Sequence, residues 1–303
     1  MEVSIFKYAD PQPFGDLCEA LHMPRDLTSR LLRDFTLLNF ETIAPWFPGL
    51  FSLENGEESV KMIPELCKTA DDITGDSGLK ALTVYLIAAL HTKELYTELG
   101  IPEDIFLDTI KALPRFSREH RDSYGRFGFD RHFWIYRQLS ANLFRLGTLE
   151  FELCRLPENV APVGPAAAGD QVLSVHIPSD AQITREALNA SYSMAGEFLA
   201  RFFPNFYCKC VYCDTWLLSP VLREILKPGS RILMFRNDYV ITKIDMTVNS
   251  GLNWVFKRYY SDFTQLPEDT SLMRGMKKIL LSGGKTGSAV GYVRDFHTFP
   301  PPC

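Results

Sequence analysis

Apolar residues recur at intervals of three and four through the first half of the chain, which is the spacing of helices with one buried face. The clearest stretch covers residues 79–90 and predicts a buried helix. Asp76 and Ser77 offer an N-cap before this helix, and Gly100 supplies a stop after it.

Two more helices are predicted further along this half. Pro102 stands near the first position of a helix over residues 103–113, where proline is favoured. Asp130 offers a cap for the next helix, whose apolar positions continue until Gly147. Because no alternating strand pattern occurs before Thr148, we expect residues 1–146 to form an all-helical N-terminal domain.

The period of the pattern changes after Gly147. Short alternating segments are separated by turn signals and by helical stretches, so residues 147–303 are predicted to form a mixed-sheet domain, α+β or α/β, with crossover connections. Strands are expected at 148–156, 171–177, 206–214, 231–236, 239–245, 253–257 and 289–293, helices at 184–203, 220–226 and 271–281, and a loop at 158–169.

Composition and charge argue against several classes of partner and location. The net charge is −5 and the pI about 5.7, which disfavours a nucleic-acid partner. The start of the chain has no basic stretch followed by an apolar one, so no secretory signal is expected. The apolar run at 79–90 falls short of the ~20 residues of a membrane span. Seven scattered cysteines fit reduced thiols, and we expect a cytoplasmic location without a membrane partner.

One candidate site is the junction between the strand 171–177 and the helix 184–203. The first turn of a helix presents backbone N–H groups and a partial positive charge, which suit a diphosphate. The alternative is structural: Thr184 or Ser179 caps the helix, and His176 is a satisfied residue at a strand end.

Three cysteines lie close together at Cys208, Cys210 and Cys213. Only one C-x-x-C pair is present and no second pair follows it, so buried apolar cysteines are favoured over a metal site. A second hypothesis makes Cys213 a covalent nucleophile with His176 as its base.

The glycine-rich segment 282–287 has some features of a phosphate-binding loop but lacks the first glycine of that pattern, since position 279 is Ile. It also follows a helix rather than a strand. We interpret it as a helix C-cap and turn.

Residues 115–137 are rich in arginine, with acidic residues interspersed. We interpret the stretch as a solvated linker. A nucleic-acid contact and an arginine facing an acidic ligand are the alternatives.

Several motifs together carry a resemblance over most of the chain. The sequence resembles a bacterial family of acyltransferases with a helical N-acyltransferase N-terminal domain and a GNAT-like C-terminal domain. The motifs are LGIP at 99–102, GRFG at 125–128, LGTLEFELCRL at 146–156, LSVHIP at 173–178, CDTWLLSP at 213–220, SRILMFR at 230–236 and TSLMRGM at 270–276.

The resemblance implies an enzyme that uses acyl-CoA or acetyl-CoA as co-substrate and needs no metal. Two adjacent parallel strands, 171–177 and 206–214, would splay apart to admit the acyl-CoA. A small-molecule or peptide amine would then attack the thioester directly, with a general base taking the amine proton. His176 or Asp214 is the expected base or acceptor-orienting group, and Ser219 the expected acid for the thiolate. The expected pyrophosphate site comprises Ile177, Ser179, Asp180, Ala181 and Thr184.

This sequence departs from the GNAT pattern in the pyrophosphate loop, which normally reads Gln/Arg-x-x-Gly-x-Gly/Ala. No glycine lies between His176 and Thr184, and Asp180 would repel phosphates if it pointed inward. The usual tyrosine acid is also missing. The alternative function is therefore a non-catalytic GNAT-like binding or regulatory module.

Overall fold

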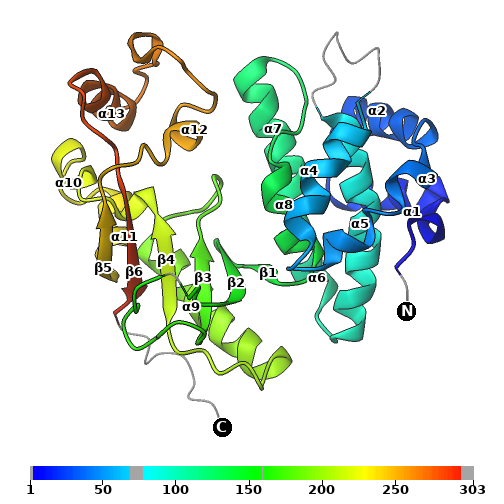
Figure 1. Cartoon of the computed structure of the whole chain (residues 1–303), viewed down its shortest axis with the longest axis horizontal. Coiled ribbons are helices and arrows are strands. Elements are labelled where there is room, and N and C mark those ends of the chain that lie inside the picture. The colour runs from blue at the N-terminus through cyan, green and yellow to red at the C-terminus, as the bar shows by residue number, and fades with distance from the viewer. Residues whose placement is uncertain (1–2, 69–77, 159, 295–303) are drawn as a thin grey trace. The chain divides into compact units, whose positions relative to one another are not determined.

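The computed structural model describes residues 3–68, 78–158 and 160–294. The chain divides into two compact units, Met1–Phe144 and Arg145–Cys303 (Figure 1). The predicted caps Asp76 and Ser77 lie outside the described residues. In the described chain, no helix is long and apolar enough to cross a membrane.

Unit 1 is built around the long helix α5 (Leu79–Glu98), which is buried on nearly every side over its first half. Because its apolar residues point in all directions, other helices surround it: α1, α2, α4, α6 and α8 all pack against it. The other elements of this unit are η1 (Ile5–Tyr8), α1 (Pro11–Ala20), α2 (Arg25–Thr36), α3 (Phe40–Ile43), η2 (Pro48–Phe51), α4 (Gly56–Leu66), α6 (Glu103–Ile110), α7 (Ala112–Tyr124) and α8 (His132–Leu139).

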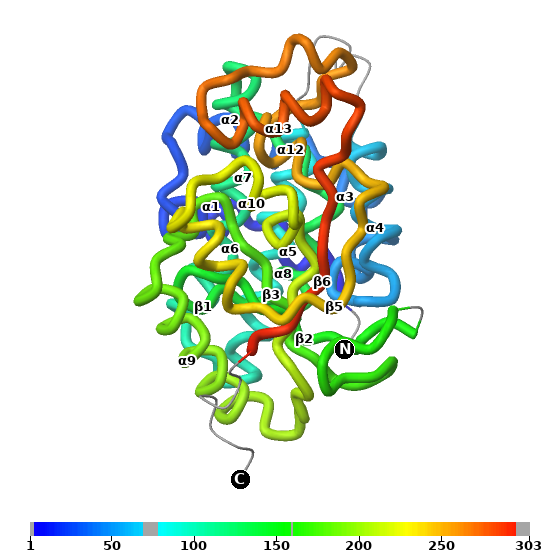
Figure 2. The backbone as a smooth tube through the Cα atoms, turned by 90° about the vertical axis from the view of Figure 1, so that its left-hand side faces the viewer, coloured from blue at the N-terminus to red at the C-terminus, as the bar shows by residue number. Residues whose placement is uncertain are grey.

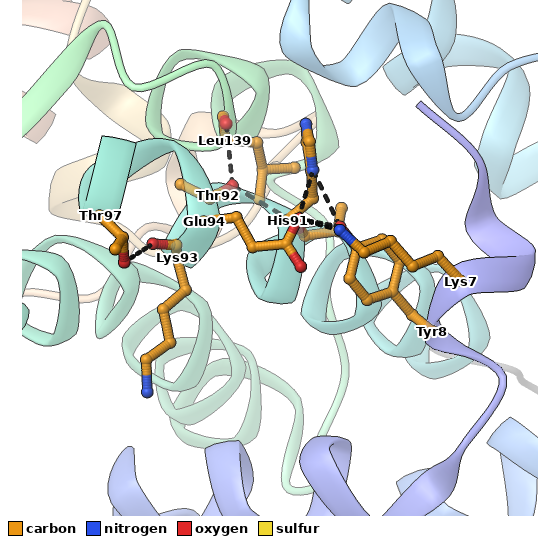
Figure 3. Close-up of polar contacts among 9 residues, drawn as sticks. Lys7, Tyr8, His91, Thr92, Lys93, Glu94, Thr97 and Leu139 are labelled. Carbon is orange, nitrogen blue, oxygen red and sulfur yellow. Dashed lines mark hydrogen bonds and ion pairs between the residues drawn. The ribbon is translucent and has the colours of Figure 1, made fainter. Parts of the chain in front are cut away.

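A polar cluster attaches the start of the chain to α5 (Figure 3). Glu94 accepts hydrogen bonds from Tyr8 Oη at 2.8 Å and from Lys7 Nζ at 2.6 Å. The ring nitrogen Nδ1 of His91 lies 2.9 Å from Tyr8 Oη and 3.3 Å from Glu94. Burial opposes ionisation of Glu94, but the hydrogen bonds from Lys7, Tyr8 and His91 outweigh it and lower the pKa of this carboxyl.

Three sequence predictions for unit 1 need correction. The predicted helix 103–113 is interrupted at Lys111, where α6 ends and α7 begins. The arginine-rich stretch is not a linker, because it contributes most of α7 and α8 and the segment that joins them. Arg115 is only 5% exposed, lies 3.9 Å from Glu119 and stacks on the ring of Phe116.

The third correction concerns the end of this half. Helix α8 begins after Arg131 rather than after Asp130 and ends at Leu139, followed by Ala141 with a positive φ of 51°. Residues Leu143–Leu146 then form a strand, β1, although none was predicted before Thr148. Gly147, with φ of 67°, makes the turn into the next strand instead of ending a helix.

Unit 2 contains the remainder of a six-stranded mixed sheet in the order β1-β2-β3-β4-β6-β5. Strands β3 and β4 run parallel, and α9 (Arg185–Phe202) is the crossover between them, whereas the pairs β2–β3, β4–β6 and β5–β6 are antiparallel. Figure 2 shows β6, drawn in red, beside β5, with which it pairs antiparallel. The strands are β2 (Leu149–Arg155), β3 (Gln171–His176), β4 (Val211–Thr215), β5 (Tyr239–Asp245) and β6 (Ser288–Val293). The predicted mixed-sheet fold class is confirmed.

The two faces of this sheet differ in character. Helix α9 packs on one face, where Tyr192 contacts Phe151 and forms a 2.9 Å hydrogen bond with Tyr239. Because side chains alternate along a strand, the intervening positions of β2, β3 and β4 point to the other face. That face carries polar side chains: Glu150, Glu152, Ser174, His176, Tyr212 and Asp214.

Two predicted strands of unit 2 are wrong, since residues 231–236 form the helix α11 (Arg231–Arg236) and residues 252–255 the helix α12 (Leu252–Val255). Ser230 caps α11 by accepting a hydrogen bond from the amide of Leu233. Both segments contribute to a local apolar cluster with α13 (Ser271–Leu281), so tertiary packing overrides their strand propensity.

The other predictions for unit 2 are confirmed with shifted ends. Strand β4 begins only at Val211, and the predicted helix 220–226 is the short α10 (Leu222–Ile225). Ser282 is the C-cap of α13 and Gly283 follows with φ of 82°, which confirms the interpretation of segment 282–287 as a helix end.

Candidate active site

The parallel strands β3 and β4 pair only near their beginnings. Their register consists of Leu173 opposite Val211 and Ser174 opposite Tyr212. Just before these pairs, the amide of Leu173 donates to the carbonyl of Cys210 at 3.1 Å. The ladder between the two strands ends past Ser174 and Tyr212 although both strands continue, so their carboxyl ends are available to line a gap.

A thiol occupies the place where the main-chain ladder stops. Cys213 Sγ donates to the carbonyl of Val175 at 3.1 Å. Cys213 is fully buried, and burial raises the pKa of its thiol well above the usual value. A thiol held in this protonated, donating state is a poor nucleophile, so the geometry does not favour the hypothesis of a Cys213 nucleophile.

His176 and Asp214 lie on the same face of the sheet, on either side of this gap. Ser174 and Tyr212 are register partners, and His176 and Asp214 lie two residues after them on their respective strands. Residues two apart in a strand share a face. The fold therefore places the two candidates for the base or acceptor-orienting group on one face, at the two strands that border the gap.

The ring of His176 is held by a carboxylate from the neighbouring strand. Its Nε2 lies 2.8 Å from Oε2 of Glu152 on β2. Both side chains are largely covered, with exposures of 21% and 15%. Glu152 was not among the predicted site residues. The alternation along β2 could have indicated it, because Glu150 and Glu152 point to the sheet face opposite the buried Phe151 and Leu153.

Asp214 lies in an environment that disfavours its charge. Withdrawal of its carboxylate from water raises the pKa of Asp214, the nearby Asp245 raises it further, and Lys243 opposes the shift. Asp214 on β4 and Lys243 on β5 are both paired with Val290 of β6. They therefore lie on either side of β6, at the same level of the sheet. Asp214 is itself exposed, so its carboxyl is open to an acceptor.

Ser219 is not presented to this face. It follows the short helix η4 (Trp216–Leu218), is 1% exposed, and donates its hydroxyl to the carbonyl of Thr286 at 2.8 Å. A buried hydroxyl already used as a donor in the fold is poorly placed to protonate a thiolate, so the geometry does not favour Ser219 as the acid.

The loop from Ile177 to Thr184 is held by its own hydrogen bonds. The amide of Ala181 donates to the carbonyl of Pro178 at 3.0 Å, so this predicted phosphate ligand is used within the loop. The amide of Gln182 donates to Oγ1 of Thr148 at 2.6 Å, which attaches the loop to the start of β2. Thr184 Oγ1 accepts from the amide of Ala187 at 3.2 Å, so Thr184 is the N-cap of α9.

The charge of Asp180 is balanced by an arginine. Arg145 Nη1 lies 2.9 Å from Asp180 Oδ1 and 3.9 Å from Glu150. Asp180 and Ser179 are exposed, and Ile177 is half-buried. The ion pair reduces the repulsion that Asp180 would exert on an approaching phosphate.

The remaining cysteines of this region have structural contacts. Cys210 is buried, as predicted, and donates to the carbonyl of Val163 at 3.5 Å. Cys208 donates to the carbonyl of Cys210 at 3.3 Å. Among the described residues, no group of three or more His, Cys, Asp or Glu side chains is arranged to hold a metal ion.

Solved structures of acyltransferases share this fold. One was determined in complex with decanoyl-CoA and teicoplanin, and it superposes with a TM-score of 0.75 at 22% identity. A mutant in complex with octanoyl-CoA and a complex with CoA and 10C-teicoplanin both give 0.75 at 21%. In each case the match covers 92% of this chain and 86% of the solved one. No curated protein matches the chain.

Two family models match consecutive parts of the sequence. The N-acyltransferase N-terminal domain matches residues 15–141, and the GNAT-like C-terminal domain matches residues 143–293. The chain therefore belongs to the family of N-acyltransferases that carry these two domains.

Proposed function

We propose that this protein transfers an acyl group from acyl-CoA to the amine of a small molecule or peptide. The observation that carries the proposal is the pair of parallel strands β3 and β4 that stop pairing at Ser174 and Tyr212, with His176 and Asp214 on one face beyond that point. Membership of the N-acyltransferase family supports it.

In the proposed reaction, the neutral amine attacks the thioester carbonyl carbon. The C–N bond forms, the C–S bond breaks, and CoA leaves as a thiolate. His176 takes the proton that the amine loses and delivers it through solvent to the departing thiolate, while Asp214 on the same face orients the acceptor amine. The products are an amide and the free thiol of CoA.

The proposed CoA site is the loop that follows β3, with Ile177, Ser179, Asp180, Ala181 and Thr184. Arg145 supports this placement, because its ion pair with Asp180 reduces the repulsion that this carboxylate would exert on the phosphates. The amide of Ala181 is bonded within the loop, so we assign Ala181 a role in loop shape rather than as a phosphate donor.

The acceptor is proposed to be an amine on a peptide-type or small molecule. Two of the similar acyltransferase structures contain teicoplanin or 10C-teicoplanin, which makes peptide amines the first acceptors to screen. A cytoplasmic location is proposed as well, because Cys154, Cys208, Cys210 and Cys213 are free thiols.

The test is a calorimetric titration with acetyl-, octanoyl- and decanoyl-CoA, followed by release of the CoA thiol with a panel of amines. We expect micromolar binding, ~−8 kcal/mol, and thiol release that depends on the amine. An absence of binding would favour the non-catalytic module instead. The hydrogen bonds within the loop, which use the amides of Ala181, Gln182 and Thr184, would then be the physical reason.

A further inference from the structure

Glu152 reaches His176 along a diagonal of the sheet. The register partner of His176 on β2 is Glu150, whereas Glu152 lies opposite Ser174. The Glu152 carboxylate therefore extends past its own partner to come within 2.8 Å of Nε2 of His176. Diagonal neighbours in an antiparallel pair are within reach of long side chains.

The backbone holds this carboxylate firmly. Strands β2 and β3 pair continuously from Glu150 opposite His176 to Arg155 opposite Gln171. The residues on either side of Glu152, Phe151 and Leu153, are buried on the α9 face, which fixes the direction in which Glu152 points. A site residue carried by a paired central strand is held more precisely than one carried by a loop.

We propose that Glu152 is a positioning residue that fixes the tautomer and orientation of His176 for the transfer reaction. The inference rests on the proposed function, in which His176 takes the amine proton. A carboxylate only accepts hydrogen bonds, so the hydrogen on the ring resides on Nε2 and points to Glu152. The neutral ring then accepts a proton through Nδ1.

The same contact acts when the ring becomes charged. As the amine attacks the thioester, the N–H bond of the amine breaks and a new N–H bond forms at Nδ1, which leaves an imidazolium. The negative charge of Glu152, 2.8 Å from Nε2, stabilises that cation. Because this stabilisation grows during the reaction, it lowers the barrier rather than strengthening acyl-CoA binding.

The experiment compares the full-length wild type with Glu152→Gln, Glu152→Asp and a matched control, Glu268→Gln. The control substitution also changes a glutamate that makes a 2.8 Å contact, because Glu268 is paired with Lys277 at an exposed position. Nitrogen-15 NMR of labelled protein reports the tautomer of each ring. The chain has six histidines, so the His176 signals are identified by their loss in His176→Gln.

We expect the wild-type ring to be protonated on Nε2 and Glu152→Gln to populate the other tautomer. In Glu152→Gln, kcat should fall roughly 10- to 100-fold, because the variant loses part of the ~10²–10⁴-fold contribution of a general base. The KM for acyl-CoA should stay within about twofold of the wild type. Glu152→Asp should recover part of kcat, and Glu268→Gln should match the wild type. Melting temperatures of all variants establish that each is folded.

The proposal is overturned if Glu152→Gln keeps the wild-type tautomer, keeps the wild-type kcat, or loses no more activity than Glu268→Gln. A loss confined to KM would also overturn it. A wild type that binds acyl-CoA but turns over no amine would refute the proposed function and the kinetic role of Glu152 together. In that case the NMR comparison still decides whether Glu152 fixes the ring of His176.

Discussion

His132 is a buried titratable residue away from the candidate catalytic groups. Its ring packs against Tyr85 at a centroid distance of 5.8 Å and against Phe129 at 5.2 Å, and its Nδ1 makes no hydrogen bond. Burial lowers the pKa of His132 to about 4, and the nearby Asp130 opposes the shift only partly. The folded state of unit 1 therefore favours the neutral ring.

This shift predicts an acid-sensitive unit 1. The unfolded chain takes up a proton on His132 near pH 6.5, but the folded chain does so only near pH 4, so stability falls as the pH drops through this window. The loss is about 3 kcal/mol by pH 4. Urea unfolding at pH 7 and pH 4 should show a smaller difference for His132→Phe than for the wild type. The exposed control His22→Asn should retain the full difference; equal slopes in all three proteins would contradict the prediction.

A second prediction at the residue scale concerns the proposed base. Replacing His176 by Gln should lower kcat by ~10²–10⁴-fold, because the amine proton loses its acceptor. Binding of acyl-CoA, measured by calorimetry, should be unchanged. If His176→Gln instead weakened acyl-CoA binding and left the rate at saturation unchanged, His176 would belong to the cofactor site and not to the chemistry.

At the scale of elements, the N-cap of α9 connects stability with the proposed CoA site. Thr184→Ala removes the acceptor for the Ala187 amide and should cost about 1 kcal/mol of unfolding free energy. Thr270 caps α13 in the same way, by accepting from Met273 at 3.1 Å, so Thr270→Ala is the matched control.

The two cap variants should differ in ligand binding. Both are expected to lower the unfolding free energy by a similar amount, but only Thr184→Ala should weaken acyl-CoA binding, since Thr184 ends the proposed loop. Calorimetric titration of both variants checks this. Equal affinities would remove Thr184 from the CoA site and leave it a structural cap.

The elements show which parts of the fold local sequence determines. The strand at Tyr239–Asp245 and the helix at Ser271–Leu281 were predicted with the observed bounds, because alternation and helical spacing are local signals. The segments at 231–236 and 252–255 are helical because they pack on α13, which is distant in sequence. The strand β1 is only four residues long and has too few positions for alternation to be recognised.

In the candidate site too, local patterns indicated some residues and contacts distant in sequence determined others. The strand patterns were enough to propose His176 and Asp214 as candidates, because the two residues lie at or near the ends of their strands. Glu152 was missed because its contact with His176 depends on the register between β2 and β3. The burial of Ser219 depends on Thr286, 67 positions further along the chain, and no local pattern reports such a contact.

At the scale of the whole molecule, the proposed co-substrate should stabilise the native state. Ligand binding to the folded chain at 100 times Kd contributes about 2.7 kcal/mol. Decanoyl-CoA should therefore raise the melting temperature, and the rise should grow with its concentration. Free decanoate at the same concentrations is the control for the acyl chain alone. A shift of equal size with decanoate would indicate a fatty-acid site instead of a CoA site.

The burial of the cysteines has a consequence for measurement. Burial raises the pKa of the thiol to about 12 for Cys18, Cys154 and Cys208 and to about 11 for Cys210, and it raises the pKa of Cys213 well above the usual value. At pH 8 these groups contain very little thiolate, so they react slowly with a disulfide dye. The CoA released in an assay can then be counted against a low protein background.

The reactivity of these thiols can also be used to measure the rate at which the native structure opens. When either unit opens, its thiols return to ordinary acidity and become accessible to the dye. Cys18 reports on unit 1, and the cysteines of β2 and β4 report on unit 2. In a Cys303→Ala background, mass spectrometry of the labelled peptides over time would yield a separate opening rate for each unit, without any engineered probe.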